Sequence, residues 1–129
     1  MDIISQIENN HAYKDVREKM KNFVIAAWKR PVLYGDITGY TLEQVANCSG
    51  GFNNMEDFTN YIMNKEENHN TRLVLYMITH VLNCRISIRH LGNGFVKCDN
   101  IPRDTALVDG NTFTIDIIID SHTGRYLWN

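Results

Sequence analysis

The side chain best suited to chemistry is Cys48, which lies in the sequence Asn47-Cys48-Ser49-Gly50-Gly51. A cysteine acts as a nucleophile when an imidazole takes its proton and a polar group orients that imidazole. The two glycines predict a flexible loop around this thiol. His122 is the imidazole nearest the end of the chain, and Asp120 is close enough in sequence to orient it. These three residues are the catalytic candidates; the competing interpretation is a surface thiol and a solvated turn histidine.

The remaining cysteines and histidines do not follow a metal-binding pattern. The pair His80 and Cys84 has no matching second pair, and the three cysteines lack Cys-x-x-Cys spacing. We therefore expect neither a metal nor a cofactor. An odd number of cysteines without a secretion signal predicts reduced thiols in a cytoplasmic protein. Cys84 and Cys98 are expected to be small buried residues, and His80 a hydrogen-bonded residue of the core.

Composition excludes several function classes. The chain has 129 residues, 43% hydrophobic and 22% charged, as expected for one ordinary globular domain. A net charge of −2 provides no basic surface for nucleic acid. No apolar run reaches the roughly 18 residues that a membrane span requires. Asp2 and Glu8 stand where a signal peptide would be basic. We expect no nucleic-acid or membrane partner.

Apolar residues repeat at helical spacing in the first two thirds of the chain. This pattern predicts a long amphipathic helix over about residues 11–28, a short turn over 42–46, and helices over 54–63 and 72–83. The last helix has a broad apolar face, which indicates burial against a sheet. The methionines on these apolar faces are expected in the core: Met20, Met55, Met63 and Met77.

From residue 85 the period changes from about 3.6 to two, which is typical of strands. Residues 85–89 alternate between apolar and polar side chains, 91–94 give a hairpin signal, and 95–98 form the returning strand. Strands are also predicted over 112–119 and 125–128. Helices followed by mostly antiparallel strands indicate an α+β domain.

The order of these elements resembles the ovarian-tumour (OTU) family of papain-like cysteine proteases and deubiquitinases. It is carried by residues 57–88, by the final strand that runs into Gly124-Arg125-Tyr126, and by HAYKDVREKM at 11–20, which is similar to a His-x-x-x-x-Val-Arg pattern of the family. The resemblance covers about residues 3–128. It implies a single OTU-like domain with N-terminal helices packed on a small, mostly antiparallel C-terminal sheet.

The chain departs from the family pattern at its catalytic positions. It contains no Asp-Gly-x-Cys motif, and Met1 falls close to the place of the nucleophile. His69-Asn70 replaces a Trp-Gly pair of the family. Arg125 stands beside Tyr126 where the family has its general base, and a guanidinium stays protonated at any working pH. The resemblance therefore implies a non-catalytic descendant.

These departures favour protein binding as the function, with ubiquitin or a ubiquitin-like modifier as the first partner to test. Arg125, Tyr126 and Trp128 are the candidate binding residues, since these residue types are enriched at binding hot spots. Alternatively, Tyr126 and Trp128 pack against the core and hold the last strand in place. Two other functions stay open. One is an active OTU-type cysteine protease whose nucleophile lies upstream or in another chain, and the other is a structural or assembly protein.

Overall fold

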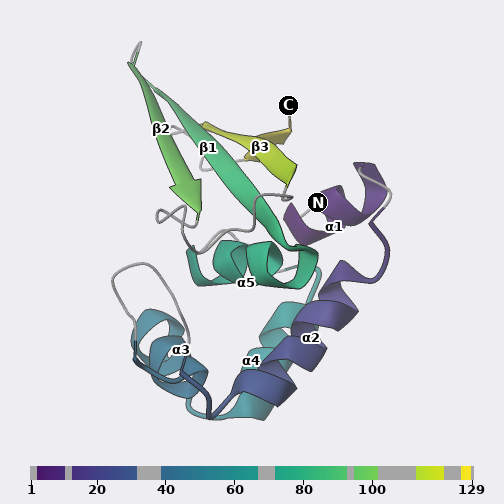
Figure 1. Ribbon diagram of the computed structural model, residues 1–129, viewed down its shortest axis with the longest axis vertical. Coiled ribbons are helices and arrows are strands. Elements are labelled where there is room, and N and C mark those ends of the chain that lie inside the picture. Colours follow the sequence, from purple (N-terminus) through teal and green to yellow (C-terminus); the bar gives the residue numbers. More distant parts are fainter. Residues whose placement is uncertain are drawn as a thin grey trace.

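The computed structural model describes residues 3–10, 13–31, 39–66, 72–92, 95–101, 113–120 and 126–128. Within these ranges the chain forms helices first and strands afterwards, so the predicted α+β class is confirmed (Figure 1). The helices are α1 (Ile3–Asn10), α2 (Val16–Ala27), α3 (Leu42–Gly50), α4 (Met55–Met63) and α5 (Arg72–Leu82). The strands are β1 (Cys84–Gly92), β2 (Phe95–Ile101), β3 (Phe113–Asp120) and β4 (Tyr126–Trp128).

The sheet is mixed, which corrects the expectation of a mostly antiparallel one. Its order is β2-β1-β3-β4, and its central pair, β1 and β3, runs parallel, while the two outer pairs are antiparallel. The parallel pairing of β1 and β3 follows from where β2 ends and β3 begins along β1. Ile101 at the end of β2 pairs with Ile86, and Phe113 at the start of β3 pairs with Cys84. Because β3 begins beside the start of β1, both strands run in the same direction.

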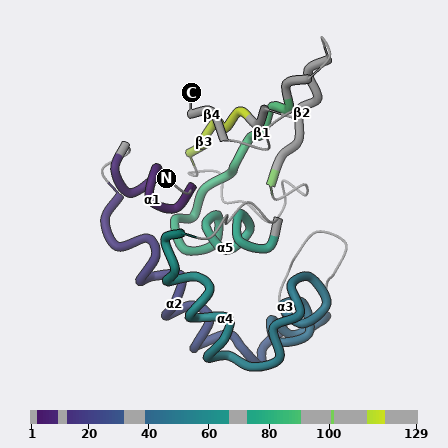
Figure 2. Tube along the Cα trace, turned by 180° about the vertical axis from the view of Figure 1, so that it is seen from behind, coloured from purple at the N-terminus to yellow at the C-terminus, as the bar shows by residue number. Residues whose placement is uncertain are grey.

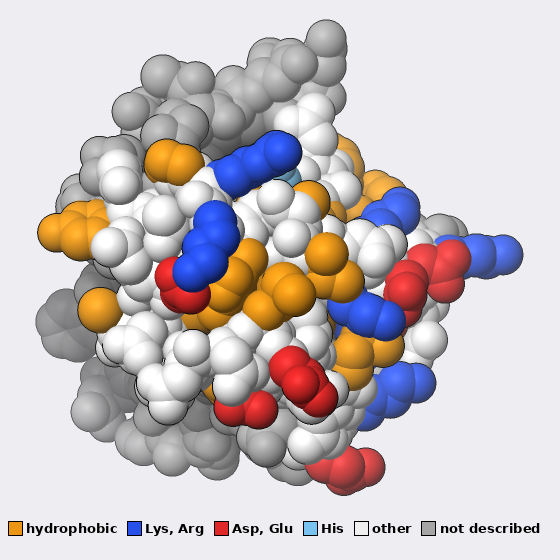
Figure 3. All heavy atoms as spheres, turned by 90° about the horizontal axis from the view of Figure 1, so that it is seen from below, with side chains coloured by type: hydrophobic (Ala, Val, Ile, Leu, Met, Phe, Trp, Pro, Cys, Tyr) orange, Lys and Arg blue, Asp and Glu red, His pale blue; other side chains and the backbone are white. Residues whose placement is uncertain are grey.

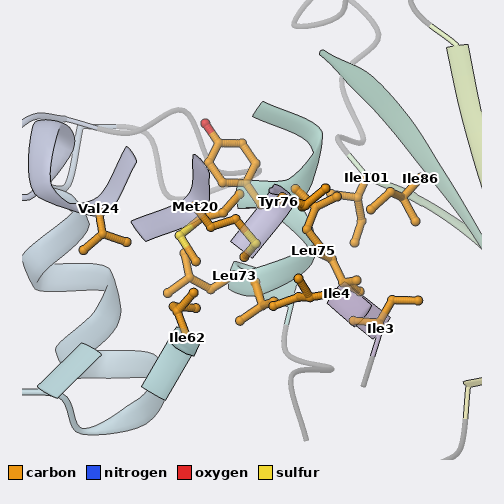
Figure 4. Close-up of a cluster of buried hydrophobic side chains, with 14 of the residues drawn as sticks. Ile3, Ile4, Met20, Val24, Ile62, Leu73, Leu75, Tyr76, Ile86 and Ile101 are labelled. Carbon is orange, nitrogen blue, oxygen red and sulfur yellow. The ribbon is translucent and has the colours of Figure 1, made fainter. Parts of the chain in front are cut away.

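The helices form the other part of the molecule. Helix α5 lies between the sheet and helices α2 and α4, and α3 lies at the far end (Figures 1 and 2). Buried apolar side chains of α5 share one core with Ile86 and Ile88 of β1 and with Ile115 and Ile117 of β3. The prediction that this helix packs on the sheet is therefore confirmed. Figure 4 shows Leu73, Leu75 and Tyr76 of α5 within this core.

The predicted N-terminal helix is shorter than expected. Residues 13–15 are not helical, and α2 begins only at Val16. Asp15, immediately before it, has a φ of 60°, the left-handed conformation, which interrupts a helix. A separate helix, α1, precedes this segment, and its Ile3, Ile4 and Ile7 are buried. The spacing of apolar residues alone does not show this interruption.

The helix starts follow from their capping residues. Thr41 Oγ1 accepts from the backbone N–H of Gln44 at 3.2 Å, while the Gln44 side chain accepts from the backbone N–H of Thr41 at 2.8 Å. This capping box starts α3 as its sequence predicts. Asn54 Oδ1 likewise accepts from the backbone N–H of Asp57 at 2.8 Å and starts α4.

The prediction that four methionines lie in the core is confirmed for two of them. Met20 and Met77 are fully buried. Met55 is only partly buried, and Met63 is 39% exposed. Met63 is the last residue of α4. The expectation of a core position is therefore wrong for Met63.

Candidate functional site

The structure places the candidate nucleophile Cys48 and the strand that ends at Asp120 in different parts of the molecule. Cys48 lies in the last turn of α3 and is exposed, so the expected flexible loop is wrong. The helix continues to Gly50 because Gly51, with a φ of 71°, provides its C-cap. Asp120 ends β3, which lies at the opposite end of the molecule from α3 in both views (Figures 1 and 2). His122 lies outside the described residues.

The C-terminal binding candidates fall at one edge of the sheet. Tyr126 and Trp128 belong to β4, and Arg125 lies outside the described residues. The Cα of Trp128 pairs with that of Ile117, whose side chain is buried. This register position matches the alternative in which the last strand is attached to the core. A binding role for Arg125, Tyr126 and Trp128 stays a prediction.

The two cysteines whose side chains are described differ in their surroundings. Cys84, at the start of β1, is 2% exposed, as its sequence context predicts. Burial raises the pKa of the Cys84 thiol to about 12. Cys84 is therefore a neutral apolar residue at physiological pH, whereas Cys48 is open to solvent. The side chain of Cys98 lies outside the described residues.

This difference predicts selective thiol chemistry. In the folded protein at pH 8, iodoacetamide should modify Cys48 and leave Cys84 unmodified until the chain unfolds. Because the folded-state pKa of Cys84 is raised from 9.0 to about 12, its contribution to stability is present below pH 9 and is lost as pH rises towards 12. Cys84→Val should reduce that loss. Site-resolved mass spectrometry measures the modification, and equal rates at both thiols would contradict the burial of Cys84.

A buried arginine is the most unusual polar feature of the helical part. Arg17 of α2 is only 3% exposed. Its Nη1 donates to the carbonyl oxygen of Ile62 at 2.6 Å, and its Nη2 donates to Ser5 Oγ at 2.9 Å. The side chain therefore joins α2 to both α4 and α1. The sequence does contain a signal for it, because Arg17 precedes Met20 and Val24 by three and seven residues and so shares their buried face.

Removing this guanidinium should weaken the packing of the three helices. Arg17→Met keeps most of the aliphatic chain but leaves the Ile62 carbonyl and the Ser5 hydroxyl without these donors. We expect a loss of about 2–3 kcal/mol in the free energy of unfolding. Arg30→Met, at an exposed position just after α2, is the matched control and should change stability by less than about 0.5 kcal/mol. Urea titration measures both, and equal midpoints would show that the Arg17 contacts carry no stability.

His80 differs from its expected place in the core. It is exposed on α5, with its ring centroid 4.5 Å from that of Phe23 and 6.5 Å from that of Tyr76. The apolar residues before it, up to Ile78, form the buried face of the helix, and His80 lies on its outer side. The expectation of a hydrogen-bonded core histidine is therefore wrong, and the ring covers aromatic surface of α2.

A pocket lies where α3, α4 and α5 meet. It has a volume of about 200 Å³ and is lined by Ala46, Ser49, Gly50, Phe52, Phe58, Tyr61 and Leu73. Ala46, Phe58 and Leu73 are buried and form its floor, whereas Ser49 and Gly50 are exposed at its mouth. The pocket therefore combines an apolar interior with an entrance from solvent.

The aromatic wall of this pocket is held by close ring contacts. The Phe52 ring centroid lies 5.0 Å from that of Phe58 and 4.8 Å from that of Tyr61. The ring centroid of Trp28, the residue that follows α2, lies 5.9 Å from that of Phe58. A Cβ at Gly50 would overlap the Phe52 ring, so the ring packs directly on this glycine. The sequence singles out Cys48, which is next to the lining residue Ser49, but it gives no signal for the pocket, because the pocket forms only when α3, α4 and α5 pack together.

Comparisons with known protein families, curated proteins and solved structures found no match to this chain. Within the described ranges, no group of three or more His, Cys, Asp or Glu residues is placed to hold a metal ion. In the same part of the chain, no helix combines the length and apolar character needed to cross a membrane.

Proposed function

We propose that this chain is a non-catalytic, OTU-like domain that acts by binding a protein, with ubiquitin or a ubiquitin-like modifier as the first partner to test. The observation that carries the binding part of this proposal is the exposure of large apolar side chains on the helices opposite the sheet. Ile25 of α2 is 50% exposed and Met63 of α4 is 39% exposed. Seen from the side opposite the sheet, the molecule shows hydrophobic side chains gathered near the middle of its surface (Figure 3).

Charged side chains surround this apolar region. Lysine, arginine, aspartate and glutamate side chains lie around the hydrophobic ones on the same face (Figure 3). Two ion pairs occur in the helical part of the described chain: Lys29 Nζ lies 2.6 Å from Glu43 Oε2, and Lys21 Nζ lies 3.9 Å from Glu18 Oε1. An apolar centre with a polar rim is the usual composition of a protein–protein interface. The arrangement supports a protein partner over a small polar substrate.

The surroundings of the thiols support a role that does not use cysteine catalysis. The Cys84 thiol is buried and, with a pKa raised to about 12, it is not a thiolate at neutral pH. Cys48 lies in the exposed last turn of α3, and β3, which ends at Asp120, the residue proposed to orient His122, lies at the opposite end of the molecule (Figure 1). A thiol without a base and an orienting group nearby has the low reactivity of a free cysteine.

Ile25→Asp tests the binding surface. The variant replaces a large, exposed apolar side chain of α2 by a charge and should weaken ubiquitin binding by about 2 kcal/mol or more, as for an interface hot spot. Ala26→Asp is the matched control, because it adds the same charge at the next exposed position without removing a large apolar side chain. Isothermal titration calorimetry measures both affinities. Equal weakening by the two variants would show a general charge effect and contradict a contact through Ile25.

The same protein should fail to react with a ubiquitin probe that carries a thiol-reactive group at its C-terminus. Labelling that disappears in Cys48→Ala would instead favour the alternative of an active OTU-type cysteine protease. Binding of other proteins through the same face, without binding of ubiquitin, would favour the structural or assembly role.

A further inference from the structure

We propose that the pocket between α3, α4 and α5 is a binding site for a neutral aromatic group of one or two rings that carries one hydrogen-bond donor. The residues that bear on this proposal are Phe52 and Tyr61 in the wall, Phe58 and Leu73 in the floor, and Ser49 at the mouth. The site does not depend on the protein-binding function proposed above.

The size of the pocket sets the size of the ligand. Its volume is about 200 Å³. An apolar cavity of about 150 Å³ lined by leucine, isoleucine and phenylalanine is large enough to bind benzene. The pocket therefore has room for a single substituted ring or for two fused rings. It is too small for the larger, drug-sized molecules that occupy pockets of roughly 300 Å³ and more.

The walls determine the character of the ligand. None of the seven lining residues carries a charge, and five of them, all except Ser49 and Tyr61, have no polar side-chain group. A charged group would lose its hydration there without gaining an opposite charge, which is unfavourable. The Phe52 and Tyr61 rings make an interplanar angle of 41°, so they offer surfaces of different orientation to a third ring. Aromatic rings prefer such offset and tilted contacts.

The mouth supplies acceptors for one donor group. Ser49 and Gly50 belong to the last turn of α3, where backbone carbonyls have no donor within the helix. The partial negative charge of a helix C-terminus favours donor groups and disfavours anions. An indole N–H or a phenol O–H can meet these carbonyls or the Ser49 hydroxyl while its ring fills the apolar interior. A carboxylate on the same ring would be repelled by the partial negative charge at the C-terminus of α3.

Titration of the ¹⁵N-labelled protein with indole tests this assignment. We expect chemical shift changes concentrated at the end of α3 and around Phe52 and Tyr61. Ser49→Leu should fill the mouth and weaken indole binding by at least about tenfold. Cys48→Leu is the matched control: it adds the same side chain at the adjacent exposed position, which does not line the pocket, and should retain wild-type affinity.

Competition experiments on the unmodified protein test the ligand chemistry without any variant. Phenol should displace indole, and benzoate should not. N-acetyl-tryptophanamide tests whether the natural ligand is a peptide side chain or a free small molecule. Affinity equal to that of indole indicates an aromatic side chain of a partner peptide. Weaker affinity indicates a free small molecule. Absence of indole-dependent shifts at millimolar concentration would overturn the proposal. Equal effects of Ser49→Leu and Cys48→Leu, or displacement by benzoate, would overturn it as well.

Discussion

Ile78→Asp should prevent stable folding. Ile78 of α5 is fully buried in the core that this helix shares with the sheet, and a carboxylate there would lie among apolar side chains. Burying an unpaired charge belongs to the most destabilising class of substitutions, roughly 4–5 kcal/mol or more. That loss is comparable to the total stability of many domains of this size. Circular dichroism during thermal unfolding measures the effect.

Asn83→Asp provides the control for this charge. Asn83 is exposed directly after α5, and its φ of 50° is a conformation that aspartate also tolerates. The control should unfold within a few degrees of the parent protein. A melting curve of Ile78→Asp that matches the parent would contradict the packing of α5 between the sheet and the other helices.

Phe58→Ala should produce the second large effect. Phe58 of α4 is 1% exposed, and its ring contacts Trp28, Phe52 and Tyr61. Its removal leaves a cavity beside the existing pocket, so we expect a loss of about 3–5 kcal/mol in the free energy of unfolding. Met63→Ala, on the exposed end of the same helix, should cost less than about 0.5 kcal/mol. Equal unfolding midpoints for the two variants would show that the aromatic cluster does not hold α4 in place.

Local patterns account for the parts of the fold that were predicted well. The capping box at Thr41 and the cap at Asn54 place two helix starts from single side chains. The alternation after residue 84 predicts β1, because one face of this strand is buried. The broad apolar face of α5 predicts its burial against the sheet. In each case the signal lies within a few neighbouring residues.

The features that were missed depend on tertiary structure. Alternation of side chains is the same in parallel and antiparallel strands, so it does not reveal that β3 pairs in parallel with β1. Asp15, between α1 and α2, adopts the left-handed conformation. Neither proline nor glycine stands at this position to indicate a break in the helix. The aromatic pocket requires α5 to pack against the neighbouring helices α3 and α4, which is a tertiary contact. The glycines after Cys48 indicated a loop, whereas one of them ends a helix.

A titration of the ¹⁵N-labelled domain with unlabelled ubiquitin, followed by NMR, tests the central claim most directly. If the domain binds through its helical face, amide shifts should concentrate on α2 and α4 around Ile25 and Met63, and ubiquitin should remain intact. The absence of shifts at millimolar ubiquitin would contradict ubiquitin as the partner. Shifts confined to β4 would contradict the helical face as the binding surface.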